Sequence, residues 1–278
     1  MVEEGLPGRW DTRVSDQPAI SMQQVRTRDG AICLYARREV LLADSGRPVL
    51  VMIHGALRNS SVLFGWIDLC APDLDVAFVD LPGHGHSQAG GPVTVEALAA
   101  NVADAISGVL GDRTVVVVGE SLGGLVALAM AGSKEGPVQA VIAADPPLST
   151  AKLWHIRTAL IDAMQKDAEN QFLRSLALNI FGFGADGSVH ERLYYNFIEQ
   201  AQLPMLILTG DVPLFPMRNV NAVPCLVDAV DRYVIGQASK GKARVELVAD
   251  CGHVLLVDAA QQCRSIIGRY CTAILAKA

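Results

Sequence analysis

One serine stands in a setting that could make it a nucleophile. Ser121 lies in the run Gly119-Glu120-Ser121-Leu122-Gly123-Gly124, directly after four consecutive valines. A serine hydroxyl attacks only when it is held exposed beside a base. A tight strand-to-helix turn gives that exposure but strains the backbone, so small residues such as Gly119 and Gly123 are needed on both sides. Glycine-rich turns also bind phosphate groups, but a strand before and a helix after the serine favour a nucleophile.

A histidine near the C-terminal end of the chain could serve as the base. His253 follows an expected strand at residues 243–248 and lies in the loop Cys251-Gly252-His253. Imidazole exchanges protons near neutral pH, which suits proton transfer to and from a serine. A lone histidine before a helix is more often a surface or capping residue, so this interpretation depends on the serine turn. His54 is expected instead to shape its own loop by hydrogen bonds to the backbone.

The elements that would position these residues alternate along the chain. Residues 48–53, 74–80 and 114–118 form continuous apolar runs that end in glycine, proline or a turn. Such runs are typical of strands buried on both faces of a parallel sheet. Further strands are expected at residues 22–26, 31–36, 138–143, 204–208 and 243–248, and helices at residues 95–110, 151–165, 171–180 and 254–275. The alternation predicts an α/β fold with a mostly parallel central sheet covered by helices on both faces.

One interval breaks this alternation. Between Pro146 and Leu203 the chain shows helical stretches without a strand, and it holds seven of the fifteen aromatic residues. We interpret residues 146–203 as an inserted helical lid, with Trp154, Phe181 and Phe183 as candidate substrate-binding residues. The alternative is an ordinary helical connection whose aromatic side chains pack on the sheet. The α/β core would then comprise residues 21–145 and 204–278, preceded by a loose lead-in at residues 1–20.

Composition excludes several classes of function. The 278 residues include 23 Lys and Arg against 29 Asp and Glu, for a net charge of −6, so the basic surface that nucleic acids require is missing. The apolar runs are shorter than the roughly 20 residues of a membrane-spanning helix. The N-terminus lacks the features of a secretory signal. The six cysteines are scattered along the chain, and cysteines spaced in this way are more often small buried apolar residues than disulfide partners. We therefore expect a cytoplasmic protein with no membrane span, no metal site and no cofactor.

Taken together, these segments resemble the α/β-hydrolase fold superfamily, and in particular a serine esterase-like member with a helical lid. Residues 51–57 resemble the strand and HGx oxyanion loop of that superfamily. Residues 80–87, DLPGHGHS, are similar to its D-x-P-G-x-G-x-S turn, and Gly252-His253 followed by Asp258 is similar to its G-H-x-x-x-x-E stretch. The resemblance extends from about residue 30 to residue 278 and is weakest across the lid.

The resemblance implies a catalytic triad of Ser121, His253 and an aspartate. The superfamily usually places this acid after the strand that follows the lid, three residues beyond a glycine, but Pro213 occupies that position here. Asp211 is the nearest carboxylate and is the expected acid. Asp145, at the end of the preceding strand, is the alternative, because some relatives carry the acid there.

The resemblance also implies an oxyanion hole and a class of reaction. The backbone N–H groups of Ala56 and Leu122 would bind the oxyanion. The expected activity is hydrolysis of a small-to-medium apolar carboxylic ester through an acyl-enzyme, with a small-molecule ester as the partner. A carbon–carbon bond hydrolase, a lactonase or a thioesterase of the same fold remains open, as does a weakly catalytic ligand-binding member, because one scaffold hosts many chemistries.

Overall fold

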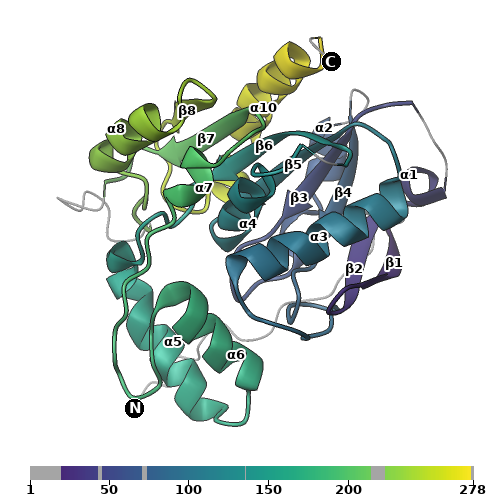
Figure 1. The fold of residues 1–278 in the computed structure, drawn as a ribbon. Coiled ribbons are helices and arrows are strands. Elements are labelled where there is room, and N and C mark those ends of the chain that lie inside the picture. Colours follow the sequence, from purple (N-terminus) through teal and green to yellow (C-terminus); the bar gives the residue numbers. More distant parts are fainter. Residues whose placement is uncertain (1–19, 43–45, 71–73, 135, 214–222, 277–278) are drawn as a thin grey trace, which may run out of the picture.

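Figure 1 shows a computed structural model of the chain, in which helices pack around a single sheet. The structure describes residues 20–42, 46–70, 74–134, 136–213 and 223–276. Nearly all of the expected lead-in at residues 1–20 lies outside the described residues. The eight strands follow the order β1-β2-β4-β3-β5-β6-β7-β8. Strands β1 and β2 form an antiparallel hairpin and β2 is antiparallel to β4, whereas all other neighbouring pairs are parallel.

The mostly parallel sheet predicted from the apolar runs is therefore confirmed, and each expected strand is present. The strands are β1 (Ile20–Thr27), β2 (Gly30–Arg37), β3 (Val49–Ile53), β4 (Asp75–Val79), β5 (Val115–Glu120), β6 (Val138–Ala144), β7 (Met205–Gly210) and β8 (Ala243–Val248). Sequence pattern gives their positions to within two residues. Strands β3 to β7 are buried along almost their whole length, which demands an unbroken run of apolar side chains, whereas β1 and β8 are partly exposed.

The helices differ more from expectation. They are α1 (Arg38–Leu42), α2 (Trp66–Cys70), α3 (Val95–Leu110), α4 (Leu122–Met130), α5 (Trp154–Lys166), α6 (Gln171–Ser175), α7 (Asn196–Glu199), α8 (Ala229–Ala238), α9 (Leu255–Asp258) and α10 (Ala260–Leu275), with 3₁₀ turns η1 (Ser60–Leu63) and η2 (Thr150–Leu153) and a π-helical segment η3 (Leu176–Phe181). Helix α3 has the expected bounds, with Thr94 accepting from the N–H of Ala97 as its N-cap. The expected closing helix at 254–275 is instead two helices, which meet at Ala259.

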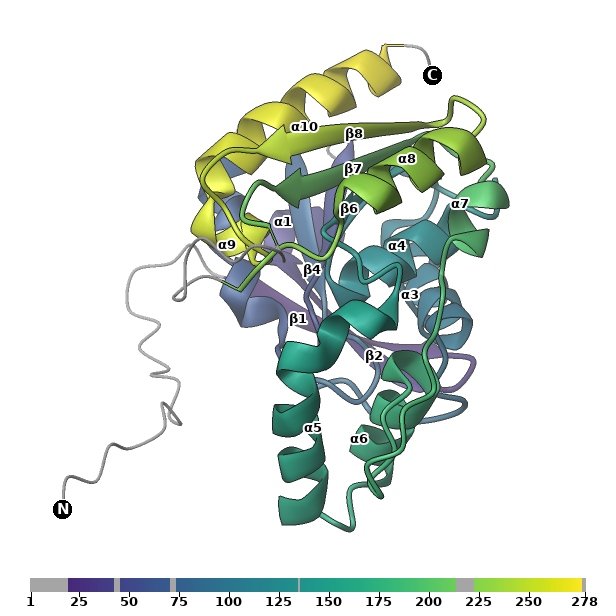
Figure 2. The same ribbon diagram turned by 90° about the vertical axis from the view of Figure 1, so that its left-hand side faces the viewer.

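Two hydrophobic clusters lie on the two faces of the sheet. In β3, Val49, Val51 and Ile53 belong to the cluster that also holds residues of α3, α4 and α8. Leu50 and Met52 point the other way, into the cluster that holds residues of α2, α9 and α10. Because successive side chains of a strand alternate between faces, a run that is buried throughout requires helices on both sides. Figure 2 shows α10 on one side of the sheet and α3, α4 and α8 on the other, as predicted.

The segment between β6 and β7, residues 145–204, contains η2, α5, α6, η3 and α7. Its two ends are joined by hydrogen bonds, from Thr150 N–H to Arg192 O (3.0 Å) and from Arg192 N–H to Thr150 Oγ1 (2.8 Å). Beyond these ends, α5 and α6 lie side by side and project away from the sheet (Figures 1 and 2). We refer to residues 145–204 as the β6–β7 segment.

Two glycines allow α4 to pack tightly against the strands that precede it. A Cβ atom on Gly123 would lie 2.5 Å from Ile53 O and 2.7 Å from His54 O, both backbone atoms at the end of β3. A Cβ atom on Gly119 would lie 1.9 Å from Gly123 O. Any larger residue at these positions would therefore push the start of α4 away from the ends of β3 and β5, where Ser121 lies.

We expect Gly123→Ala to lower the free energy of unfolding by about 1–3 kcal/mol, because the added methyl group meets backbone that cannot rotate away. Gly236→Ala is the matched control, since Gly236 lies in α8 and, apart from the backbone of its own helix and its chain neighbours, no atom lies within 4 Å of its added Cβ. The control should gain about 0.5–1 kcal/mol from helix propensity. Urea unfolding of the two variants measures both values, and equal midpoints would contradict the packing argument.

Candidate active site

Ser121 lies between β5 and α4 in a strained backbone conformation. Its φ is 55° and its ψ is −115°, outside the regions that residues other than glycine usually adopt. The conformation is held from both sides, because Ser121 N–H donates to Ala144 O (2.9 Å) and Ser121 O accepts from Leu125 N–H (3.1 Å). The expected tight turn after the valine strand is therefore present.

His253 lies against this serine. Its Nε2 is 3.0 Å from Ser121 Oγ, and its side chain is 15% exposed. The backbone N–H of His253 donates to Val223 O (2.8 Å), which fixes the loop after β8 that carries the imidazole. The two residues singled out from the sequence as nucleophile and base are thus brought into hydrogen-bond contact.

The carboxylate beside His253 is that of Asp145. Its Oδ2 lies 2.7 Å from His253 Nδ1, and the residue is fully buried. The same carboxylate accepts from Thr209 Oγ1 (2.9 Å) and from the N–H groups of Leu226 (2.8 Å) and Val227 (3.0 Å). With a proton on Nδ1 donated to Asp145, Nε2 is left free to accept from Ser121 Oγ.

Asp211, the acid expected first, lies elsewhere. It is exposed, and its Oδ1 accepts from Cys251 N–H (3.3 Å) in the loop before His253. The structure therefore places the alternative, Asp145, against the imidazole and leaves Asp211 away from it. The physical reason is that the chain turns sharply after β6, where Asp145 has a φ of 44°. This turn directs the carboxylate toward β7 and the histidine loop.

The two residues expected to supply oxyanion N–H groups are Leu122, which directly follows Ser121, and Ala56, in the loop after β3. Leu122 is the first residue of α4, where backbone N–H groups have no partner within the helix. Ala56 follows Gly55, and a Cβ atom on Gly55 would lie 3.3 Å from Ser121 Cβ. The loop after β3 therefore passes directly beside the serine, and it can do so because residue 55 is a glycine.

His54 fixes this loop through the backbone, as expected. Its Nδ1–H donates to Gly55 O (2.7 Å), and its Nε2 accepts from Leu81 N–H (3.1 Å). The ring is fully buried. Burial, with a smaller contribution from His84, lowers the pKa of His54 to about 4. Because Nε2 accepts a hydrogen bond, the loop geometry requires the neutral ring.

A neighbouring turn is held by another buried carboxylate. Asp80 accepts from the N–H groups of Ser60 (2.8 Å) and His86 (2.9 Å) and from Tyr35 Oη (2.8 Å). A Cβ atom on Gly85 would lie 2.0 Å from Asp80 Oδ2, so the turn closes over the carboxylate only with glycine there. These bonds to the carboxylate hold its pKa below the usual value despite burial. The sequence DLPGHGHS is thus a structural turn beside the oxyanion loop.

A cavity of about 480 Å³ opens next to this loop, between the core and the β6–β7 segment. It is lined by Leu57, Arg58, Asn59, Ser61, Val62, Gly83, His84, Gly85, Asn170, Phe172, Leu173 and Leu176. The aromatic ring at the cavity is thus Phe172, which was not among the candidates named from the sequence. Phe181 and Phe183 are each 2% exposed and pack in the hydrophobic core, whereas Trp154 is 54% exposed on α5. Helical periodicity shows which residues share a face, but it does not show which face the core covers.

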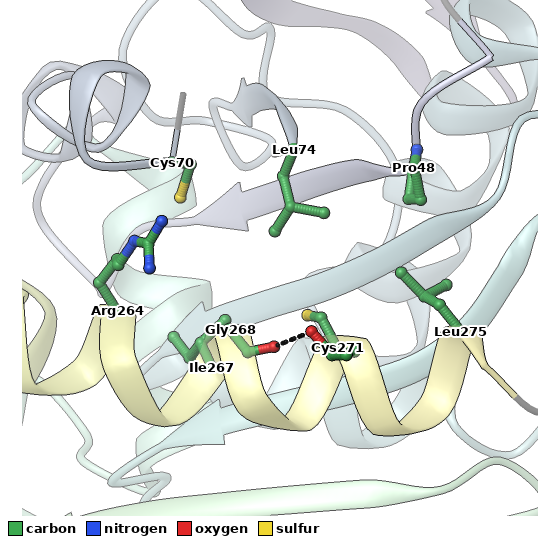
Figure 3. Close-up of a pocket in the computed structure, with 9 residues that line it drawn as sticks. Pro48, Cys70, Leu74, Arg264, Ile267, Gly268, Cys271 and Leu275 are labelled. Carbon is green, nitrogen blue, oxygen red and sulfur yellow. Dashed lines mark hydrogen bonds between the residues drawn. The ribbon is translucent and has the colours of Figure 1, made fainter. Parts of the chain in front are cut away.

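A second cavity, of about 230 Å³, lies under α10. Ser121, Asp145 and His253 line neither of these two cavities, although the first one adjoins the loop that passes beside Ser121. Figure 3 shows side chains of α10, among them Arg264 and Cys271, facing Cys70, Leu74 and Pro48. All six cysteines are buried. Within the described residues, no group of three His, Cys, Asp or Glu side chains could hold a metal ion. Among the helices of the described ranges, none is both long and apolar enough to cross a membrane.

The neutral state of His54 predicts a pH dependence of stability. In the unfolded chain His54 is protonated below the ordinary histidine pKa of about 6.5. In the folded chain it is protonated only below about pH 4. The contribution of His54 to stability is therefore fully present above pH 6.5 and is lost as the pH falls, by about 2 kcal/mol at pH 5.

Urea unfolding at pH 7.5 and pH 5 measures this loss, and His54→Asn should show a smaller difference between the two pH values than the unchanged chain. His84, whose pKa is also lowered by burial, is present in both proteins. Equal differences in the two proteins would contradict the assignment of the neutral, accepting ring.

Comparison with known proteins bears on the fold and the family of the chain. The model of the alpha/beta hydrolase family matches residues 50–265, which is more than half of the chain. The pimeloyl-[acyl-carrier protein] methyl ester esterase of Yersinia pseudotuberculosis is 30% identical over 172 residues, which cover 59% of this chain and 65% of that protein. Lipase LipV of Mycobacterium tuberculosis is 35% identical over 107 residues, 38% of this chain and 40% of that protein. The chain thus matches less than two thirds of the length of these curated relatives.

The crystal structure of carboxylesterase CesB (YbfK) from Bacillus subtilis superimposes with a TM-score of 0.61 at 15% identity, covering 94% of this chain and 93% of that chain. At this identity the likeness shows a shared fold. Together with the family match across residues 50–265, it leads to one conclusion. The chain belongs to the alpha/beta hydrolase family.

Proposed function

We propose that this protein is a serine hydrolase that cleaves carboxylic esters through an acyl-enzyme. The observation that carries the proposal is the continuous line of contacts from Ser121 Oγ to His253 Nε2 (3.0 Å) and from His253 Nδ1 to Asp145 Oδ2 (2.7 Å). A nucleophile joined to a base, which is in turn oriented by a buried acid, is the arrangement that acyl transfer requires. The esterase and lipase named among the relatives support the same reaction class.

In the proposed mechanism, Ser121 attacks the ester carbonyl while His253 takes the proton from its hydroxyl. Asp145 keeps the imidazole in the tautomer that presents Nε2 to the serine, and it stabilises the imidazolium ion that forms. The N–H groups of Ala56 and Leu122 bind the negative charge that develops on the carbonyl oxygen. His253 then returns its proton to the leaving alcohol. Water, activated by the same histidine, releases the acid and restores the serine.

The proposed substrate is a small-to-medium ester with an apolar acyl group. The cavity beside the oxyanion loop supports this size and polarity, because Leu57, Val62, Phe172, Leu173 and Leu176 contribute apolar side chains to a volume of about 480 Å³. In this proposal residues 146–203 act as a lid, since Phe172 and Leu176 reach the cavity from the β6–β7 segment. Trp154 remains a candidate contact at the exposed start of α5.

The test of the function is hydrolysis of a p-nitrophenyl ester series, acetate through laurate, by the unchanged protein and by Ser121→Ala. We expect turnover that the alanine variant loses by several orders of magnitude, because the triad acts as a unit. The chain-length optimum then reports the size of the acyl pocket. Equal activity in both proteins would show that Ser121 is not the nucleophile, and inactivity of the unchanged protein on all members of the series would contradict ester hydrolysis.

The two aspartates give a sharper test of the assigned acid. Asp145→Asn should lower kcat by about 10³–10⁴-fold, because an amide donates to Nδ1 and leaves the proton on the wrong nitrogen. Asp211→Asn is the matched control and should change kcat by less than about threefold, since its side chain accepts only a long bond from Cys251 N–H among the hydrogen bonds described. Steady-state kinetics on the best ester of the series compares them. The reverse ranking would restore Asp211 as the acid.

A further inference from the structure

A second buried carboxylate lies beside the candidate triad and has no part in the mechanism above. Glu120 is the last residue of β5, directly before Ser121, and is 2% exposed. Moving a carboxylate out of water costs several kcal/mol unless other groups bind it. Its partners therefore indicate what the buried charge does.

The contacts of Glu120 join three segments of the site. Its Oε1 accepts from the backbone N–H of Leu256 (2.8 Å), which lies three residues beyond His253. Its Oε2 is 3.5 Å from Nη1 of Arg58, which lies two residues beyond Ala56. One carboxylate thus connects the nucleophile strand, the loop that carries the base and the loop that borders the oxyanion position.

The loop after His253 is held from its other side as well. Trp66 Nε1 donates to Leu256 O (2.8 Å), so both polar backbone atoms of Leu256 are bound by buried side chains. Trp66 and Glu120 come from different elements, α2 and β5. Leu256 is therefore a fixed point from which the chain leads back to the imidazole.

The charges around Glu120 bear on its protonation. The pKa of Glu120 is raised, chiefly by burial, although the N–H of Leu256 and the charges of His253 and Arg58 favour the anion. Asp258 opposes the anion, and the thiols of Cys251 and Cys263 face the same region, where their own pKa values are raised by burial. Asp145 is the other carboxylate near His253, with which it forms a hydrogen bond. A negative charge in this surrounding of low polarity acts on the imidazole with little screening by water.

We propose that Glu120 is a positioning residue for His253, one that holds the histidine loop through Leu256 and, as an anion, stabilises the imidazolium ion formed when Ser121 gives up its proton. This inference rests on the proposed serine hydrolase function. It assigns the residue before the nucleophile a role of its own, distinct from the turn geometry that Gly119 and Gly123 provide.

The test uses Glu120→Gln, which keeps an oxygen to accept from Leu256 N–H but removes the charge, and Glu120→Ala, which removes both. Glu199→Gln, at an exposed position at the end of α7, is the matched control. Rates of ester hydrolysis and of covalent modification of Ser121 by an organophosphate are measured from pH 5 to pH 9. Thermal unfolding reports the stability of each variant.

We expect Glu120→Gln to lower kcat about tenfold with KM changed by less than about twofold, because the imidazolium ion is a feature of the transition state and not of the bound substrate. Removal of the anion makes protonation of the imidazole less favourable, so the acid limb of the pH–rate profile moves to lower pH. Glu120→Ala should lose about a further tenfold, because Leu256 N–H is then left without an acceptor.

Arg58→Gln provides a second measurement with the opposite sign. Loss of the guanidinium leaves the charge of Glu120 less compensated, so the acid limb should move to higher pH. An acid limb that stays in place in both variants overturns the proposal, and so does a fall in kcat of Glu120→Gln that only follows its stability. If the unchanged protein is not labelled at Ser121 at all, the proposed function fails instead. Labelling at equal rates in the unchanged protein and Glu120→Gln refutes the role of Glu120 alone.

Discussion

The buried carboxylate of Asp145 is the interaction on which the arrangement of the site depends. A charge without exposure is stable only when its lone pairs are bound, and here four donors bind them, from Thr209, Leu226, Val227 and His253. These donors come from β7, from the chain before α8 and from the loop after β8. Each of these segments must therefore be in place before the carboxylate is satisfied, so the position of His253 is tied to the geometry of the sheet.

The sheet supplies the second constraint, since neighbouring parallel strands end at one edge and bring the residues that follow them together. Ser121 and Asp145 follow β5 and β6, and both have a positive φ, 55° and 44°. The chain turns away sharply at the end of each of these two strands. This turn leaves the side chain at the edge of the sheet and not on one of its faces. The strain of two such turns is tolerated because Ser121 N–H donates to Ala144 O and Asp145 N–H donates to Leu208 O, so each turn is held by the next strand along.

The parts of this fold that follow from local pattern could be predicted from sequence. Continuous apolar runs predict the buried strands. The serine turn is predicted by glycines at positions where a larger side chain would not fit. The acid could not be assigned in this way, because Asp145 and Asp211 both follow strand ends, and only the path of the chain between them decides which one meets the histidine. Ala144-Asp145-Pro146-Pro147 does signal a sharp turn, but not its direction. The residues that line the cavity could not be predicted for a related reason. Phe172 and Phe181 both lie in helical stretches of the chain, and only the packing of the folded chain shows that Phe172 lines the cavity and Phe181 lies in the core.

The candidate catalytic residues and one wall of the neighbouring cavity come from different parts of the chain. Ser121, Asp145 and His253 follow strands of the core, whereas Phe172, Leu173 and Leu176 reach the cavity from the β6–β7 segment. That segment is anchored to α8 by buried Asp231, which accepts from Lys152 near its start and from Tyr195 near its end. The anchor thus fixes both ends of the segment at α8, apart from the strand ends after which Ser121 and Asp145 lie. The wall of the cavity is therefore shared, because Leu57 and Val62 of the core line the same space as Phe172 and Leu176 of the β6–β7 segment.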